Sequence, residues 1–201
     1  MEYYVNLFVS RNKENRDVAD FHQRREAFLA AMDDEHVSSR FDSFVHAGVS
    51  GEVCRWYRSV NARKMGKVRK ALITKLVNDD NLVLTHMDSL TASLAAKPEN
   101  AATKFWLFDV DISDVNEQVK FLMDLKDAAH LTKIPQENEE GEKLELPVLV
   151  GTRVYKTPNG LGVVVYDGFN PLELLGRWEG KVELKRDAMV FLKRKKRAVV
   201  E

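Results

Sequence analysis

The sequence predicts an α+β fold, with a mixed or antiparallel sheet and flanking helices. Short runs of β-branched and aromatic residues alternate with longer segments whose apolar residues recur every three or four positions. An Asn-Gly pair between two apolar runs in the last third of the chain is typical of a β-hairpin. Because no repeat or low-complexity linker divides the 201 residues, we expect a single domain spanning 1–201.

In the first half of the chain, patterning predicts strands at 3–9, 41–45 and 52–60, and helices at 17–33, 63–77 and 88–96. The helix at 17–33 is predicted from the spacing of Val18, Phe21, Phe28 and Met32, with Arg25 as the polar exception. The helix at 63–77 carries a basic outer face, and Lys97-Pro98 ends the third helix.

In the second half, an apolar strand at 105–111 precedes a helix that reaches about residue 131. Asp114 and Glu117 form a capping-box pattern at the start of that helix. The hairpin is expected to join 147–156 to 161–166, with Asn-Gly at positive φ in its turn. A short helix should begin after Asn170-Pro171 and close at Gly176, and extended sequence should follow over 181–193.

Composition excludes several classes of protein. Lys+Arg and Asp+Glu balance at 31 each, so any attraction for nucleic acid must be local. The single Cys54 excludes an internal disulfide and a cysteine-built zinc site. No apolar run approaches the roughly 20 residues of a membrane span, and the first residues do not resemble a signal peptide. We therefore expect a cytoplasmic protein with no membrane partner.

Charge is concentrated in three segments. Basic residues gather between 55 and 75 and again in a C-terminal tail at 193–201, whereas 136–146 is an acidic, Gly-containing segment expected to be a loop. A basic tail can contact phosphates, but it is also a common solubilising terminus.

The most informative motif is Asp109-Val-Asp111 at the end of the apolar strand. Residues two apart on a strand project from the same face, so the two carboxylates should lie side by side. Such a pair suits a hard divalent cation, and Mg²⁺ or Mn²⁺ is the expected ligand. The alternative is that Asp109 only ends the strand and Asp111 belongs to the next loop.

Several landmarks occur in an order that resembles the archaeo-eukaryotic primase (primase-polymerase) superfamily, in particular its small phage proteins. Asp109-Val-Asp111 resembles the first catalytic motif, and Lys156-Thr-Pro-Asn-Gly160 resembles the turn before the second. Asp187 resembles the lone aspartate of the third motif, and Arg55-Trp-Tyr-Arg58-Ser-Val-Asn61-Ala-Arg63 resembles an upstream segment. Where such relatives carry a histidine, this chain has Gly162.

The resemblance implies a primase-like core and two-metal nucleotidyl transfer, with a nucleoside triphosphate and DNA or RNA as ligands. Asp109, Asp111 and Asp187 would be catalytic and hold Mg²⁺ or Mn²⁺. Arg55, Arg58, Arg63, Lys156 and Asn159 would bind the nucleotide and its phosphates. A phage-encoded member would act in DNA replication in the host cytoplasm.

Two other functions stay open at this point. The chain can be a catalytically inactive protein on the same fold that binds nucleic acid or a partner through its basic segments. A haloacid-dehalogenase-type phosphatase also has Asp-x-Asp after an apolar strand, with the first aspartate as nucleophile. In that family the motif lies near the chain start, whereas here it lies mid-chain and continues Ile112-Ser113-Asp114.

Overall fold

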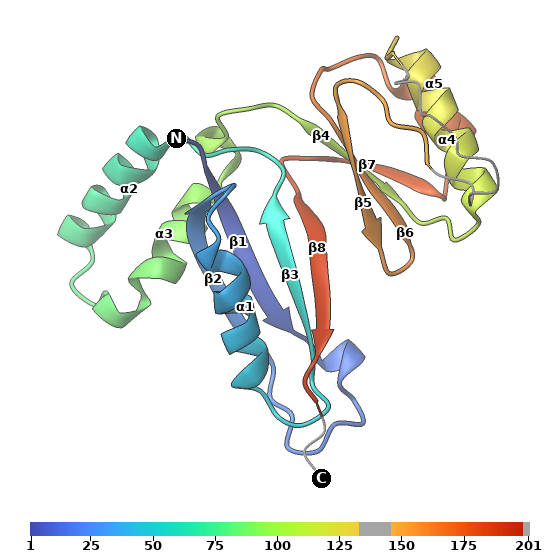
Figure 1. Ribbon diagram of the computed structural model, residues 1–201. Helices are drawn as coiled ribbons and strands as arrows, with labels where there is room; N and C mark the ends of the chain where they lie inside the picture. Colours follow the sequence, from blue (N-terminus) through green and yellow to red (C-terminus); the bar gives the residue numbers. More distant parts are fainter. Residues whose placement is uncertain (133–145, 199–201) are drawn as a thin grey trace. The chain divides into compact units, whose positions relative to one another are not determined.

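The computed structural model of the chain describes residues 1–132 and 146–198. These residues form two compact units, each with its own four-stranded sheet (Figure 1). Unit 1 comprises residues 1–103 and the chain from 191 onward, and unit 2 comprises residues 104–190. The expected α+β class with antiparallel sheets is confirmed. A single α+β domain spanning 1–201 was expected, whereas the structure shows two sheets with separate cores.

Unit 1 has the strand order β2-β1-β3-β8. Its strands are β1 (Tyr3–Ser10), β2 (Arg24–Ala31), β3 (Val53–Ser59) and β8 (Met189–Lys196). Its helices are α1 (His36–His46), α2 (Met65–Asn78) and α3 (Met87–Ala95), with 3₁₀ turns η1 (Asn12–Glu14), η2 (Leu84–His86) and η3 (Pro98–Asn100). β1 is antiparallel to both β2 and β3.

The core of unit 1 lies between its sheet and α1. Phe8 on β1 is fully buried and contacts the rings of Phe28, Phe41, Phe44 and Trp56 at centroid distances of 5.1–5.8 Å. These rings come from two other strands and from α1, so one aromatic cluster joins the sheet to the helix. The other face of the sheet is contacted by α3 at β2 and β1.

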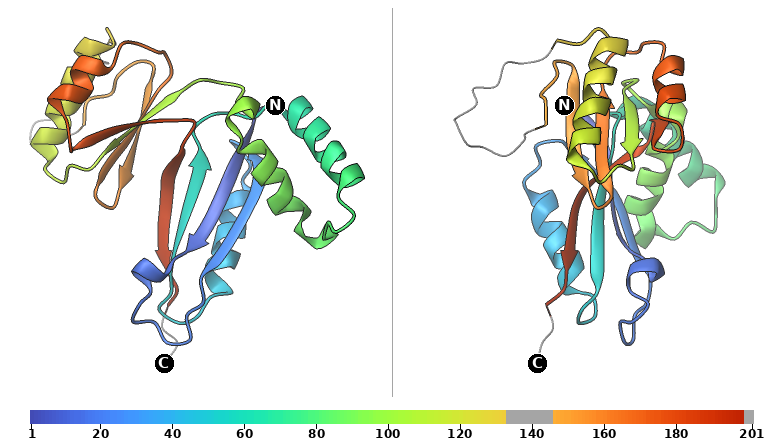
Figure 2. Two further views of the ribbon diagram at one scale, coloured as in Figure 1. Left: turned by 180° about the vertical axis from the view of Figure 1, so that it is seen from behind. Right: turned by 90° about the vertical axis from the view of Figure 1, so that its right-hand side faces the viewer.

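Unit 2 has the strand order β5-β6-β4-β7, and all three pairings are antiparallel. Its strands are β4 (Trp106–Val110), β5 (Thr152–Thr157), β6 (Gly160–Val165) and β7 (Val182–Arg186), and its helices are α4 (Val115–Ala128) and α5 (Leu172–Arg177). Figure 2 shows both helices of this unit on the same face of its sheet.

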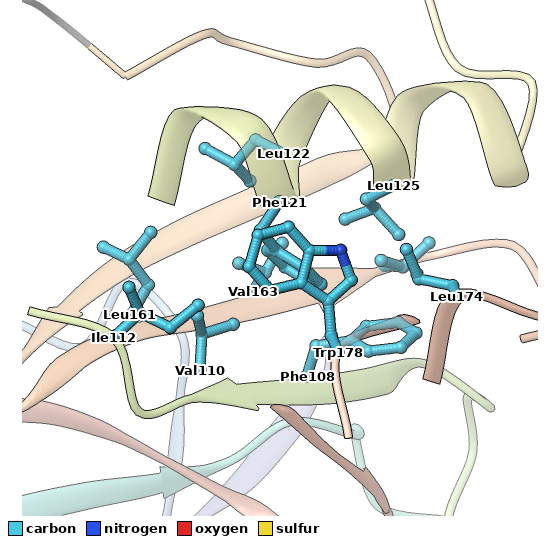
Figure 3. Close-up of a cluster of buried hydrophobic side chains, with 11 residues drawn as sticks. Phe108, Val110, Ile112, Phe121, Leu122, Leu125, Leu161, Val163, Leu174 and Trp178 are labelled. Carbon is cyan, nitrogen blue, oxygen red and sulfur yellow. The ribbon is translucent and has the colours of Figure 1, made fainter. Parts of the chain in front are cut away.

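The core of unit 2 fills the space between that sheet face and the two helices (Figure 3). Its fully buried residues include Phe108 and Val110 of β4 and Phe121, Leu122 and Leu125 of α4. Because Phe108 and Val110 are two residues apart on a strand, they share a face, and the side chain of Asp109 must project from the opposite one.

The predicted helix at 17–33 is wrong, because residues 24–31 form strand β2. The segment Arg-Arg-Glu-Ala-Phe-Leu-Ala-Ala has high helix propensity, and pairing with β1 over all eight residues overrides it. Ala27, Phe28, Ala30 and Ala31 are all buried, since α1 packs on one face of the strand and α3 contacts it as well. Burial on both faces removes the period-two signal of a strand.

The predicted strand at 41–45 is also wrong, because this segment belongs to α1. The buried positions are Val37, Phe41, Phe44 and Val45, a spacing of four, three and one residues. That spacing is the apolar stripe of an amphipathic helix. Residues 41–45 alone are too few to show it, because the stripe begins at Val37.

The remaining helices and strands are confirmed, with some changes at their ends. The Asp114 side chain accepts a hydrogen bond from the Glu117 N–H (2.8 Å), which is one half of the expected capping box. The hairpin of β5 and β6 is present, but its loop is Pro158-Asn159 and Thr157 pairs with Gly160. Neither Asn159 nor Gly160 has positive φ, so the expected turn geometry is wrong.

Close approach of β4, rather than turn geometry, accounts for Gly160. A Cβ atom there would lie 2.0 Å from the Val110 carbonyl oxygen and 2.9 Å from the Ile112 backbone nitrogen. Only glycine lets the start of β6 lie this close to the end of β4.

The extended sequence over 181–193 divides into two strands that belong to different sheets, β7 in unit 2 and β8 in unit 1. Lys193–Lys196 therefore lies in the outer strand of a sheet and is not a tail. The acidic segment 136–146 lies, apart from Leu146, outside the described residues. Within the described ranges, no helix has the length and apolar character needed to cross a membrane.

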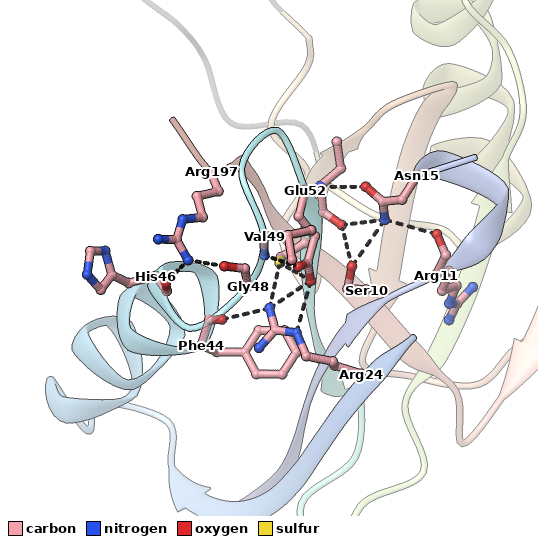
Figure 4. A network of polar contacts seen from close by, with 12 residues as sticks. Ser10, Arg11, Asn15, Arg24, Phe44, His46, Gly48, Val49, Glu52 and Arg197 are labelled. Carbon is pink, nitrogen blue, oxygen red and sulfur yellow. Dashed lines mark hydrogen bonds and ion pairs between the residues drawn. The ribbon is translucent and has the colours of Figure 1, made fainter. Parts of the chain in front are cut away.

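A buried ion pair links the start of β2 to the segment just before β3 at one end of the unit 1 sheet (Figure 4). Glu52 is 1% exposed, and its carboxylate accepts hydrogen bonds from Arg24 (2.7 Å) and from the Val49 N–H (2.8 Å). Its backbone carbonyl accepts from the Arg197 N–H (2.8 Å), so the same residue also holds the chain just after β8. Burial acts to raise the pKa of Glu52, but these hydrogen bonds outweigh it and the pKa is lowered.

Replacing Glu52 with glutamine should lower the free energy of unfolding by about 2–4 kcal/mol near neutral pH, because Arg24 loses its buried counter-charge. In the wild type the folded-state pKa is depressed. The contribution of the ion pair is therefore present above the unfolded pKa of about 4.3 and is lost as the pH falls through the lower folded value. Urea unfolding as a function of pH measures both effects. Glu173→Gln, which breaks an exposed i,i+4 pair with Arg177, is the control and should change little.

Gly160→Ala should destabilise the protein by about 2–3 kcal/mol, since the new methyl group meets backbone atoms that cannot move aside cheaply. Gly176→Ala on α5 is the matched control, because a Cβ atom there has nothing within 4 Å. That change should be neutral or stabilise by up to about 1 kcal/mol through helix propensity. Equal melting temperatures for the two variants would contradict the close approach of β4 and β6.

Candidate functional site

The carboxylate of Asp109 is paired with a lysine from the neighbouring strand. Asp109 on β4 lies opposite Gly162 on β6 and Glu183 on β7, so these positions share the sheet face away from α4. The Lys185 ammonium contacts the Asp109 carboxylate and lies 3.1 Å from that of Glu183. Burial acts to lower the pKa of Lys185, but the two carboxylates outweigh it and raise the pKa. A protonated lysine thus occupies the place where the sequence predicts a metal ion.

The other two predicted metal ligands do not join Asp109. Asp111 lies beyond the end of β4 and is exposed, and its N–H donates to the Lys181 carbonyl (2.9 Å). Asp187 lies in the turn after β7 with φ of 50°. Since Glu183 is opposite Asp109 and Arg186 is opposite Trp106, Asp187 is four residues, or about 13 Å, further along the sheet.

The three carboxylates therefore do not form a shared ligand set. In the described part of the chain, no group of three or more His, Cys, Asp or Glu side chains is arranged to hold a metal ion. The binding of Mg²⁺ or Mn²⁺ at these residues stays a prediction from the motif.

The predicted nucleotide ligands of unit 2 lie away from Asp109. Lys156 is opposite Leu161, whose side chain lies in the core under α4, so it projects from the sheet face opposite to that of Asp109. Asn159 is exposed in the β5–β6 turn. At Gly162 a Cβ atom would lie 3.3 Å from Val190 Cγ2 and 3.4 Å from Leu107 Cδ1, so a larger side chain would displace these neighbours.

The predicted phosphate-binding arginines belong to unit 1, where each makes contacts within the unit. Arg58 donates to Asn6 Oδ1 and to the Met32 carbonyl, both at 3.1 Å, and lies over the Trp56 ring. Arg63 is 5% exposed, and its N–H donates to the Tyr3 carbonyl (2.8 Å). These contacts, and in Arg63 the burial of the side chain, indicate a structural role for both. Arg55 differs, because it lies within a surface group of aromatic and basic residues.

That surface group lies on the sheet face opposite α1. Trp56 packs into the α1 core, so its neighbours Arg55 and Tyr57 must project from the other face of β3. The Phe191 ring on β8 meets the Tyr57 ring edge-to-face, with 5.8 Å between centroids and 73° between planes. Both side chains are partly exposed.

A second residue of β8 reaches this group through an ion pair. Arg194 Nε lies 3.7 Å from the Glu14 carboxylate, which also pairs with Arg55 (2.6 Å). Leu192 packs against the α1 core, and Lys195 pairs with Asp42 of α1 (2.9 Å). Arg194 therefore lies near Arg55, whereas Lys195 reaches α1.

The group is completed by cations that contact the rings. The guanidinium carbon of Arg11 lies 5.4 Å from the Tyr57 ring centre, and that of Arg55 lies 5.8 Å from the Phe191 ring centre. Arg55 also donates to the Tyr57 hydroxyl (3.2 Å). We call Arg11, Arg55, Tyr57, Phe191 and Arg194 the aromatic–arginine cluster.

Among the described residues, the carboxylate that pairs with the cluster is that of Glu14 on η1, which lies 2.6 Å from Arg55 and 3.7 Å from Arg194. Burial acts to lower the pKa of Arg55, but its hydrogen bonds to Tyr57 and Glu14 outweigh it and raise the pKa. Arg55 therefore keeps its charge, and three arginines against one carboxylate give the cluster a net positive charge. Sequence patterning identified Arg55 and the basic stretch 193–197 but missed the rings, because Tyr57 and Phe191 meet only when β8 pairs with β3.

Comparisons with protein-family models, with curated proteins and with solved structures found no match. The resemblance to the primase-polymerase superfamily therefore stays a prediction from sequence motifs.

The pairing of Asp109 with Lys185 predicts that these aspartates do not contribute to the binding of a metal ion with a nucleotide. Because the ammonium group already neutralises the carboxylate, Mn²⁺ with a nucleoside triphosphate should shift the melting temperature of the wild type and of Asp109→Asn/Asp111→Asn alike. Differential scanning fluorimetry with and without a chelator measures this. Stabilisation by metal and nucleotide in the wild type alone would instead place a metal centre at these aspartates.

Proposed function

We propose that the chain binds single-stranded nucleic acid on the aromatic–arginine cluster of unit 1. The observation that carries the proposal is the contact of two partly exposed rings, Tyr57 and Phe191, with Arg11 and Arg55. A third arginine, Arg194, lies beside them through its ion pair with Glu14. Rings of this kind stack on bases, and the arginine guanidinium groups pair with phosphates.

The position of the rings favours a single strand over a duplex. Bases within a duplex are stacked on one another, and only unpaired bases can reach rings that lie on the face of a sheet. Since Tyr57 and Phe191 are 73° from parallel, we expect one base to stack at this point rather than two. Lys13 and Lys196 are exposed on η1 and β8, the segments that carry Glu14 and Arg194, and add positive charge to these segments.

This proposal corresponds to the non-catalytic alternative that the sequence left open. The aspartates expected for nucleotidyl transfer are in unit 2, whereas the arginines expected to bind phosphates are in unit 1. Metal-dependent nucleotidyl transfer remains a prediction from the resemblance, and the cluster itself contains no group that would perform it.

Fluorescence anisotropy with a labelled oligodeoxythymidylate tests the proposal. Phe191→Ala should weaken binding by about 1–3 kcal/mol, the usual contribution of one stacked base. Tyr166→Ala in unit 2 is the matched control, because Tyr166 is also a partly exposed member of a ring pair, with Phe105 at 4.7 Å. It should leave the affinity unchanged.

The affinity of the wild type should also fall steeply with salt, as phosphate contacts require. Equal affinities for Phe191→Ala and the wild type would contradict the proposal. So would a preference for duplex over single-stranded oligonucleotide of the same sequence.

A further inference from the structure

We infer that the position of the Glu14 carboxylate between Arg55 and Arg194 is the subsite for a backbone phosphate of the bound strand. Glu14 occupies this subsite in the free protein and must leave it when nucleic acid binds. The inference rests on the proposed function and adds to it the place of the phosphate and the group that competes for it.

The geometry is that of an anion held by two cations. The same Glu14 oxygen, Oε1, lies 2.6 Å from Arg55 Nη2 and 3.7 Å from Arg194 Nε. The two guanidinium groups come from β3 and β8, so the sheet itself sets the distance between them. The Glu14 side chain is 15% exposed, so the anion position is largely covered in the free protein and opens only when Glu14 leaves it.

The chemistry of this position suits a phosphodiester. A guanidinium group pairs with carboxylate and phosphate oxygens through the same charge-assisted hydrogen bonds, and a phosphodiester carries the same single negative charge as Glu14. The Phe191 ring lies beside the position, since it contacts Arg55. A nucleotide whose base stacks on that ring therefore has its phosphate within reach of the two arginines.

Glu14, rather than the arginines, is the group that can move. Arg55 projects from the paired strand β3, and its guanidinium is tied to the Tyr57 hydroxyl (3.2 Å). Glu14 belongs to the three-residue turn η1, whose other members Asn12 and Lys13 are exposed. A small rearrangement of this turn withdraws the carboxylate while the arginines stay on the sheet.

Glu14→Gln should therefore bind a labelled oligodeoxythymidylate more tightly than the wild type, by roughly fivefold. The plot of log affinity against log salt should steepen by about 0.7–1.4, because one or two arginines become free to contact phosphate. Asp42→Asn is the matched control. It removes the same charge from the same unit and frees Lys195, but it does so on the α1 side of the sheet. It should produce a clearly smaller gain.

Two further variants separate phosphate competition from a general charge effect. Glu14→Asp keeps the charge but shortens the side chain, so it cannot span both arginines and should also bind more tightly than the wild type. In an Arg55→Met background, the gain from Glu14→Gln should largely disappear. Thermal unfolding of each variant checks that the fold is retained.

The possible outcomes are distinct. If the wild type binds and Glu14→Gln binds equally or more weakly, the phosphate subsite is overturned and the proposed function stands. The subsite is likewise overturned if Asp42→Asn gives a gain equal to that of Glu14→Gln. If neither the wild type nor Glu14→Gln binds single-stranded oligonucleotide at low salt, the proposed function fails and the subsite fails with it.

Discussion

The pairing of β8 with β3 is the contact on which the candidate site depends. The chain leaves unit 1 after residue 103, forms the whole of unit 2, and returns as the outer strand of the first sheet. This return places Phe191 against Tyr57 and Arg194 near Arg55 and Glu14. The buried Glu52–Arg24 pair holds the far end of the same strand, because the Glu52 carbonyl accepts the Arg197 N–H. Stability and the proposed binding surface therefore share one structural element.

Most of the fold was predictable from local patterning, and the failures have specific causes. The strand at 106–110, the helix after Asp114 and the β5–β6 hairpin follow directly from apolar runs, a capping residue and turn residues. Strand β2 could not be predicted, because its alanine-rich sequence favours a helix and both of its faces are covered. The division into two sheets was missed because a change of sheet at Asp187 leaves no mark in hydrophobic periodicity.

The site was less predictable than the fold. Asp109 and Asp111 do follow a buried strand, as expected, but the sequence does not reveal that Lys185 from a neighbouring strand faces Asp109. Arg58 and Arg63 are basic residues whose hydrogen bonds go to segments distant in the chain. The aromatic–arginine cluster is assembled from residues near 11, 56 and 192, and only the strand order brings them together. Long-range pairing therefore decides which charged residues are free to bind and which serve the fold.

Photocrosslinking is the most direct test that unpaired bases lie on this cluster. An oligonucleotide carrying 5-bromodeoxyuridine should crosslink to Tyr57 or Phe191, and peptide mapping by mass spectrometry would locate the modified residue. High salt or excess unlabelled single strand should abolish the crosslink, because phosphate contacts hold the strand in place. Crosslinks confined to unit 2, or none under conditions where the oligonucleotide is bound, would contradict the account.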